Sequence, residues 1–251
     1  MSVHQTIFPQ TAVIIPCLNE EESIADVVRE VFSVSVREVI VVDNGSTDRT
    51  AKYAELAGAK VVSEPRRGYG FACAAGLSAV GSDVEIVCFI DGDGSDVAAL
   101  LPFVIHPLMK GEADFVMGSR LRGKREPGSM TMPQIVAGWL AGVLLRLKYG
   151  VTFTDMSPLR GMRVKSLKAI GMTERTYGWN LEMQMRVAAA GLKTLEFPAD
   201  HRCRRGGQSK VSGNLSAGLT AAWKISITFF RLAATLPRKT ACQLQSTTRE
   251  H

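Results

Sequence analysis

The sequence predicts an α/β domain built on a mostly parallel β-sheet that is flanked by helices. Short runs of strand-forming residues alternate with helical patterns through the first half of the chain, which is typical of βαβ units. Several of these runs end in polar or acidic residues, and parallel sheets bind ligands at the carboxyl ends of their strands. With 251 residues, the chain is long enough to bury a full core without disulfides or metals.

Five strands are expected in the first half, each from a run of β-branched or other apolar residues. They cover residues 12–16, 38–43, 60–63, 84–91 and 114–118. Helices are expected to begin near residues 19, 48, 69 and 98. In the first of them Ile24, Val27, Val28 and Val31 share one face, which is the spacing of an amphipathic helix.

The second half is less regular. Residues 127–145 contain no charged residue and include an apolar helix at 135–145, with Pro133 and Gln134 interrupting its start. This helix is shorter than the roughly 20 residues that a bilayer span needs, so we expect it to be buried or interfacial. A helix at 177–190 and a short strand at 194–197 follow.

The chain is expected to close with a long, largely apolar helix at 214–236 and a polar tail from Pro237. Lys224, Arg231 and Arg238 are spaced by seven residues, so they line one stripe of this helix. Trp223 lies off that stripe. Two interpretations stay open: an amphipathic helix lying on an anionic membrane surface, or a core helix with a basic outer face.

Charge and cysteine usage narrow the function classes. The formal net charge is +6, which suits phosphate ligands or an anionic membrane. No nucleic-acid motif is present and the basic residues are not interleaved with stacking aromatics, so no nucleic-acid partner is expected. The five cysteines show no metal-ligand spacing, and Cys17 and Cys88 are expected as reduced, buried thiols. The first ten residues do not resemble a signal peptide, which favours a cytoplasmic protein.

The most informative motif is Asp91-Gly92-Asp93, directly after the fourth strand. Neighbouring carboxylates repel each other, so a fold tends to keep them where a cation or ligand relieves the repulsion. Mg²⁺ is often held by one or two carboxylates together with substrate phosphates. The motif alone also occurs in plain turns, so its meaning depends on the rest of the chain.

Six segments together resemble the family 2 glycosyltransferases, in the branch of dolichyl-phosphate mannose and glucose synthases and their bacterial polyprenyl-phosphate relatives. They occur in the family's order over roughly residues 10–235. The segments are Val13–Glu20, Val41–Thr50, Phe89–Asp93, Gly118–Arg120, Gly178–Met183 and Arg204–Ser212.

The resemblance implies a GT-A fold over residues 10–212. The residue pattern adds an amphipathic helix at 213–236, with membrane contact as one of its two interpretations, and a polar tail at 237–251. The resemblance also implies a nucleotide-diphosphate sugar donor and a divalent cation, Mg²⁺ or Mn²⁺, with Asp91 and Asp93 as the metal ligands. The positions that match the family's donor site are Pro16, Leu18, Glu20, Val42, Asp43, Asn44, Asp91 and Gly92. Asn44 stands where many synthases of this type have Asp, and its amide is expected to remain able to read a base edge.

Basic groups are needed to stabilise the departing diphosphate. Arg120, Arg204 and Lys210 are the candidates, together with the metal ligand Asp93, because guanidinium and ammonium groups suit phosphate oxygens. From charge alone, a solvated basic loop is the competing interpretation. The family resemblance favours the phosphate role.

No general base is obvious. The four histidines, His4, His106, His201 and His251, fall at the ends of the chain, beside a proline or in a loop. An acceptor that is already an anion needs no proton removed, whereas an alcohol does. Asp155 and Glu182 match acidic positions of the family, and we expect them to be acceptor-site or loop-organising groups.

The sequence therefore predicts a metal-dependent, inverting transfer of a hexose to a polyprenyl phosphate at the cytosolic membrane face. The alternatives are the same donor chemistry on a hydroxyl acceptor, or a non-catalytic nucleotide-binding module. A simple dehydrogenase is disfavoured, because no GxGxxG follows the first strand.

Overall fold

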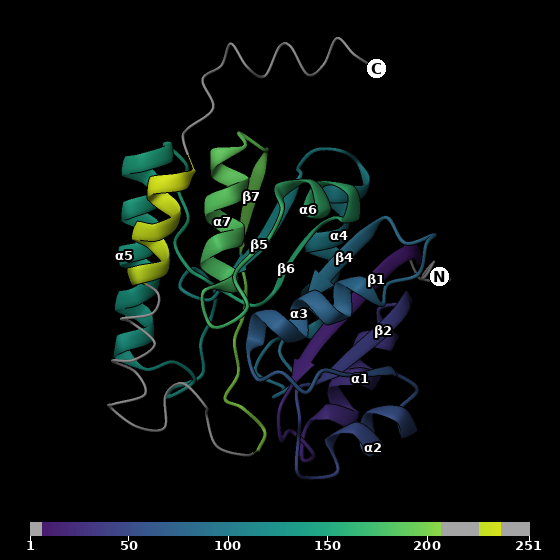
Figure 1. The fold of residues 1–251 in the computed structure, drawn as a ribbon. Helices are drawn as coiled ribbons and strands as arrows, with labels where there is room; N and C mark the ends of the chain where they lie inside the picture. The colour runs from purple at the N-terminus through teal and green to yellow at the C-terminus, as the bar shows by residue number, and fades with distance from the viewer. Residues whose placement is uncertain (1–6, 207–225, 237–251) are drawn as a thin grey trace, which may run out of the picture.

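The computed structural model describes residues 7–206 and 226–236. Within these ranges it forms three layers, with helices on both faces of a seven-stranded sheet (Figure 1). The strand order is β3-β2-β1-β4-β6-β5-β7. β6 runs antiparallel to β4 and β5, and the other neighbouring strands are parallel. The prediction of a mostly parallel α/β sheet is confirmed.

The strands are β1 (Phe8–Cys17), β2 (Val36–Asp43), β3 (Lys60–Ser63), β4 (Ile86–Phe89), β5 (Phe115–Ser119), β6 (Arg160–Arg163) and β7 (Thr194–Pro198). The helices are α1 (Ile24–Ser33), α2 (Thr50–Leu56), α3 (Tyr69–Ser78), α4 (Leu101–Met109), α5 (Met132–Tyr149), α6 (Val164–Ile170) and α7 (Trp179–Ala189). A short 3₁₀ turn, η1 (Ala98–Leu100), precedes α4.

The central strand β1 is buried on both faces, as a parallel strand between two helical layers must be. Successive side chains point to opposite faces, so Ala12 and Ile14 join one core cluster while Val13 and Ile15 join the other. The first cluster lies under α3, α5, α6 and α7, and the second under α1, α2 and α4. The expected burial of Cys17 and Cys88 is also observed.

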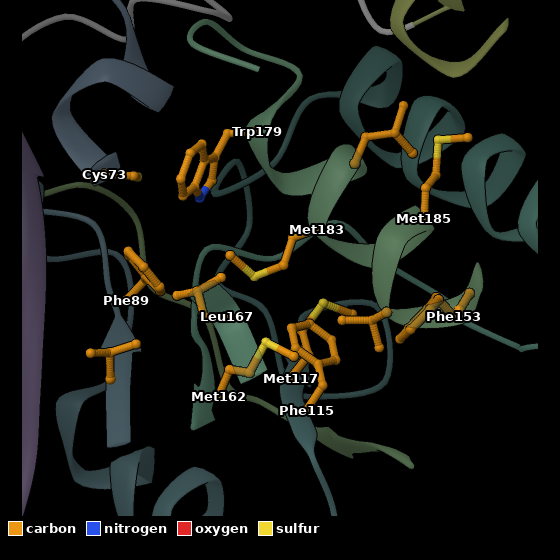
Figure 2. Close-up of a cluster of buried hydrophobic side chains, with 14 of the residues drawn as sticks. Cys73, Phe89, Phe115, Met117, Phe153, Met162, Leu167, Trp179, Met183 and Met185 are labelled. Carbon is orange, nitrogen blue, oxygen red and sulfur yellow. The ribbon is translucent and has the colours of Figure 1, made fainter. Parts of the chain in front are cut away.

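The core beside β5 and β6 is rich in methionine. Met117, Met162 and Met183 pack there with Phe115 and Phe153 (Figure 2). The flexible methionine side chain fills irregular gaps, which suits a place where an antiparallel strand interrupts a parallel sheet. This packing fixes α7 against the sheet, and the ring of Trp179 lies edge-on to Phe89 with centroids 6.5 Å apart.

Strand β6 and helix α6 were not predicted. β6 is only four residues long, Arg-Gly-Met-Arg, and shows no clear alternation of apolar and polar residues. Arg160 nevertheless lies completely inside the protein, where it donates to the carbonyl oxygens of Ser157 and Asn180. Burial lowers the pKa of this guanidinium to about 10. Arg160 thus ties β6 to the start of α7, a role that residue type alone does not reveal.

Helix α5 is longer than expected. Pro133 lies in its first turn and Gln134 forms a capping box with Thr131, so these residues begin the helix and do not interrupt it. Gly150 ends it with a φ of 75°.

Residues 226–235 are helical and lie beside α5, beyond α7 (Figure 1). The Tyr149 hydroxyl donates to the carbonyl oxygen of Leu236 at 3.1 Å, and Lys148 donates to that of Ala233. No helix among the described residues is both long and apolar enough to cross a bilayer. Lys224, Arg238 and the rest of the predicted terminal helix and tail lie outside the described residues.

Candidate active site

The loops that follow β1, β2 and β4 meet at one edge of the sheet and are joined by hydrogen bonds. The amide of Glu20 donates to the Thr50 hydroxyl at 2.8 Å, and the Ser23 hydroxyl donates to the carbonyl of Gly92 at 2.8 Å. A side chain on Gly92 would meet the Cys17 sulfur at 2.4 Å, so this close approach requires glycine. The three polar strand ends predicted from the sequence therefore converge.

Three carboxylates crowd together after β4. Asp91 donates its amide to the Asp96 carboxylate at 3.1 Å, and Asp93 accepts the amide and hydroxyl of Ser95 at 2.9 and 2.6 Å. Burial, and then the charges of Asp96 and Asp93, hold the pKa of the Asp91 carboxyl well above its usual range. A divalent cation beside Asp91 and Asp93 would relieve this unfavourable arrangement.

The described residues could supply only part of a metal's coordination shell. Among the described residues there is no group of three or more His, Cys, Asp and Glu side chains that could hold a metal ion. Two carboxylates and an open side fit a cation of the Mg²⁺ type, which retains waters and shares ligands with substrate phosphates. Asp91 and Asp93 fit this pattern.

Arg204 reaches this carboxylate group from far along the chain. Its Nη2 donates to both oxygens of Glu20 at 2.9 and 2.8 Å, and its Nη1 lies 3.8 Å from Asp93 Oδ2. The segment that carries it is tied to the Asp-Gly-Asp loop, since the Arg205 amide donates to the carbonyl of Asp93 at 3.0 Å. The predicted residues Glu20, Asp93 and Arg204 are therefore brought together.

Arg120 is held on the other side of the site by Asp155. Its guanidinium donates to the two Asp155 oxygens at 2.8 Å each, and its amide donates to Oδ2 at 3.0 Å. Asp155 is only 1% exposed. Burial alone would raise the pKa of this carboxyl, but the charge and hydrogen bonds of Arg120 hold it below its usual range. Asp155 therefore positions Arg120, as a loop-organising group would.

Of the two roles expected for Glu182, acceptor site or loop organisation, its contacts fit the second. Its carboxylate is completely buried and accepts the amide and hydroxyl of Thr173, the amide of Glu174 and Nε of Arg186. These donors use the lone pairs that a general base needs. Glu182 therefore organises the 173–176 loop.

Two of the predicted donor-site side chains also point elsewhere. The Asn44 amide nitrogen donates to the carbonyls of Glu64 and Arg66, and its oxygen accepts the amide of Gly68, each at 2.8 Å. Both N–H groups are used within the protein, so the amide could read a base edge only through the second lone pair of its oxygen. Val42 is fully buried in the core and offers only its backbone.

The other predicted donor-site residues lie at the sheet edge. Pro16, Leu18 and Asp43 are half-buried at the ends of β1 and β2. The Asp43 carboxylate accepts the Ser46 amide at 3.0 Å. Lys210 lies outside the described residues, so its phosphate role remains a prediction.

Sequence reasoning missed two residues of this site. Asp96 adds a third carboxylate, and the run Asp91-Gly-Asp-Gly-Ser-Asp96 contained that signal. Tyr69 donates its hydroxyl to Asp91 Oδ1 at 3.2 Å. Burial and the charge of Asp91 raise the pKa of Tyr69 well above its usual value, so the phenol stays protonated. Nothing near Tyr69 in the sequence marked it as a site residue.

Comparison with known proteins agrees with this geometry. Residues 12–171 match the family described as glycosyl transferase family 2. An uncharacterized glycosyltransferase of Mycobacterium tuberculosis is 39% identical over 85% of this chain and 96% of its own length. A dolichyl-phosphate hexose transferase of Haloferax volcanii is 32% identical over 81% of this chain and 87% of its own.

Solved structures share the fold. A crystal structure of glucosyl-3-phosphoglycerate synthase from Mycobacterium tuberculosis, in complex with Mn²⁺, UDP-glucose and phosphoglyceric acid, superposes with a TM-score of 0.71. The two proteins are 22% identical, and the match covers 90% of this chain and 80% of the synthase. At this identity the similarity establishes the fold, and the GT-A architecture predicted from the sequence is confirmed.

Proposed function

Because the chain belongs to glycosyl transferase family 2, we propose that it transfers a hexose from a nucleotide-diphosphate sugar to a polyprenyl phosphate. The reaction takes place at the cytosolic membrane face and inverts the anomeric configuration. An oxygen of the lipid phosphate attacks the anomeric carbon as the bond to the nucleoside diphosphate breaks. The electron pair of that bond leaves with the diphosphate.

Arg120 and Arg204 support the donor half of this proposal. Arg120 directly follows β5 and its charge acts on Asp91, whereas Arg204 follows β7 in the sequence and lies 3.8 Å from Asp93. A departing diphosphate gains negative charge, and preorganised guanidinium groups stabilise such charge with little reorganisation. Mg²⁺ or Mn²⁺, held by Asp91 and Asp93, would supply Lewis-acid stabilisation of the same oxygens.

The observation that carries the acceptor assignment is the state of the two candidate bases. Asp155 is committed to Arg120, and Glu182 is committed to the 173–176 loop and Arg186. A hydroxyl acceptor would need a general base to take its proton, and neither of these two is free to do so, whereas a lipid phosphate is already anionic. The dolichyl-phosphate hexose transferase relative acts on a substrate of this kind by name.

The exposed face of α5 supports a location at the membrane. Met132, Val136, Trp139, Leu140 and Leu147 lie on this face, and the side chains of Trp139 and Leu147 are 61% and 78% exposed. Residues 127–154 contain no acidic residue, whereas Arg146 and Lys148 are basic. An apolar helix face with basic neighbours suits an anionic lipid surface.

This surface adjoins the site. On the opposite face of α5, a side chain at Gly138 would lie 3.4 Å from the Asp155 carboxylate. The helix that faces the lipid is therefore packed directly on the residue that holds Arg120. A membrane-bound acceptor would meet the site without leaving the bilayer surface.

The C-terminal helix supports this location less than the sequence suggested. Arg231, which was expected on the basic stripe, pairs with Glu174. Ile227 and Phe230 are exposed on the same helix, which lies beside α5.

A second candidate is the same transfer onto a hydroxyl of a soluble metabolite. The glucosyl-3-phosphoglycerate synthase complex, which contains phosphoglyceric acid, shows that this fold also receives a soluble acceptor. That reaction requires one of the committed carboxylates to be released. It predicts transfer without lipid and a pH profile that reports a general base.

The test is a donor screen on the purified chain with Mn²⁺ and either a short-chain polyprenyl phosphate or 3-phosphoglycerate. Radiolabelled UDP-glucose, UDP-galactose, UDP-N-acetylglucosamine and GDP-mannose are supplied one at a time. We expect one donor to label the organic phase only when lipid phosphate and metal are both present. Label that moves only to the soluble acceptor would replace the first proposal with the second.

A further inference from the structure

Tyr69 is the one neutral donor that contacts the Asp91 carboxylate within the described residues. Its hydroxyl lies 3.2 Å from Oδ1. On the other side of the residue, the Asp91 amide is bound by Asp96 at 3.1 Å. Asp91 is therefore held at both its main chain and its side chain.

The position of Tyr69 is set by an unusual start of helix α3. Gly68 provides no side-chain cap, so the first amides of the helix need other acceptors. The amide of Gly70 donates to the carbonyl of Thr176 at 3.2 Å, and that of Phe71 donates to Arg175 at 2.9 Å. A side chain on Gly70 would meet the Arg175 main chain at 2.7 Å. Glycine here lets the 173–176 loop cap α3.

The 173–176 loop is itself fixed from within. Glu182 accepts the amides of Thr173 and Glu174, and the Glu174 carboxylate accepts the amide of Thr176 at 3.0 Å. A continuous set of contacts thus runs from Glu182 through this loop to the start of α3. It ends at the Tyr69 hydroxyl and Asp91.

The Tyr69 ring packs against the core cluster shown in Figure 2. Cys73, one turn further along α3, is a completely buried member of that cluster. The Tyr69 ring therefore has a fixed backbone origin and a packed core beside it. A group held in this way can orient a carboxylate more precisely than a mobile surface side chain can.

We propose that Tyr69 is a positioning residue that orients the Asp91 carboxylate for the divalent cation, and that Glu182 supports it through the 173–176 loop. This inference rests on the proposed metal-dependent donor site and is independent of the acceptor. Groups that hydrogen-bond a metal-ligating carboxylate commonly change metal affinity by about 10–100-fold when they are removed.

The test measures Mn²⁺ binding directly, by electron paramagnetic resonance of the free ion in the presence of UDP and without any acceptor. Tyr69→Phe removes only the hydroxyl, and we expect it to weaken Mn²⁺ binding by about tenfold. Excess Mn²⁺ should restore most of the turnover, and KM for the acceptor should stay unchanged.

Tyr149→Phe is the matched control, because it removes a tyrosine hydroxyl bonded to Leu236, away from the acidic cluster. It should leave Mn²⁺ binding at the wild-type value. A Tyr69→Phe protein that binds Mn²⁺ as tightly as wild type, or an equal loss in Tyr149→Phe, would overturn the proposal.

A second variant keeps the test informative if Tyr69→Phe fails to fold. Gly70→Ala retains the hydroxyl but pushes the start of α3 away from Arg175. It should weaken Mn²⁺ binding through displacement of the phenol, whereas unchanged binding in the folded variant would contradict the role of the loop. Wild-type protein that binds no Mn²⁺ with UDP would instead refute the metal site itself.

Discussion

The acidic side chains on the two sides of the site are held in opposite ways. On the side of β5–β7, Asp155 and Glu182 are buried and paired with Arg120 and Arg186. On the side of β1–β4, Asp91 lies beside Asp93 and Asp96, and its pKa is raised where that of Asp155 is lowered. The charges of Asp155 and Glu182 are neutralised by arginines without any ligand. The repulsion among the carboxylates around Asp91 is expected to be relieved when a cation binds.

The largest expected effect comes from the side of β1–β4. Asp93→Asn keeps the shape of the side chain but removes a charge that pairs with Arg204 and that the proposed cation would use. We expect turnover in the donor screen to fall at least about 10³-fold, as when a central electrostatic group is removed from an active site, while circular dichroism shows an intact fold.

Asp26→Asn is the control for Asp93→Asn, because Asp26 pairs with Arg29 on the exposed surface of α1. Its turnover should match that of wild type. More than a tenth of wild-type turnover in Asp93→Asn would break the comparison, since the site would then work without this carboxylate.

On the side of β5–β7, Asp155→Asn should lower the stability of the protein. The substitution leaves the Arg120 guanidinium, 15% exposed, without its counter-charge. Breaking a buried pair from one side typically costs about 3–5 kcal/mol in the free energy of unfolding. Chemical denaturation of wild type and variant measures this loss, and a difference below about 1 kcal/mol would show that the pair is not what holds the segment.

The pH dependence of the same pair has a definite sign. Because the pKa of Asp155 is lowered in the folded state, its stabilisation is present above the unfolded value near 3.9. That stabilisation is lost as the pH falls through the folded pKa. The stability gap between wild type and Asp155→Asn should therefore be constant from about pH 5 to 7 and should narrow in more acidic solution.

The two sides also differ in how well the sequence predicts them. β1–β5 follow from apolar runs that end in polar residues, and the convergence of Glu20, Asp43 and Asp91 follows from parallel strand geometry. β6 was missed because its burial depends on Arg160 and on core methionines, which no local pattern encodes. On the same side the predicted helix at 177–190 and strand at 194–197 are observed as α7 and β7. Long-range packing therefore decided β6 in particular.

The hydrogen-bond partners of polar residues were the hardest feature to predict. The hydrogen bonds of Asn44 and Glu182 go to backbone groups of residues 64–68 and 173–174. A sequence shows that a polar residue follows a strand or begins a helix. It does not show which backbone amides will reach that residue first, and Tyr69 went unnoticed for the same reason.

A third prediction tests whether the exposed face of α5, and not that of α2, contacts lipid. Trp139→Glu places a charge on the exposed face of α5, and Leu56→Glu does the same on α2, where the leucine is 74% exposed. Burial of a large apolar side chain is worth about 2 kcal/mol, so Trp139→Glu should weaken binding to vesicles containing phosphatidylglycerol by about tenfold or more.

Flotation of the protein with these vesicles measures the effect, and Leu56→Glu should float like wild type. Equal losses in both variants would indicate a general effect of added negative charge. No loss in either would exclude the α5 face as the contact, and a wild-type dimer that covers Trp139 would assign the face to a second copy of the chain.

The smallest expected effect is on the thermal stability of Asp91→Asn, and it has the opposite sign to the effect of Asp155→Asn. The pKa of Asp91 is raised in the folded protein, so its ionisation costs stability as the pH rises from about 3.9 through the folded pKa. Without metal at pH 7, Asp91→Asn should therefore unfold at a higher temperature than wild type, by roughly 2–4 °C for each kcal/mol regained. Mn²⁺ with UDP should raise the unfolding temperature of wild type and leave that of the variant nearly unchanged. The aspartate-to-asparagine change would then destabilise the protein at Asp155 and stabilise it at Asp91. The reason is that Asp155 is paired with an arginine, whereas Asp91 lies beside two other carboxylates.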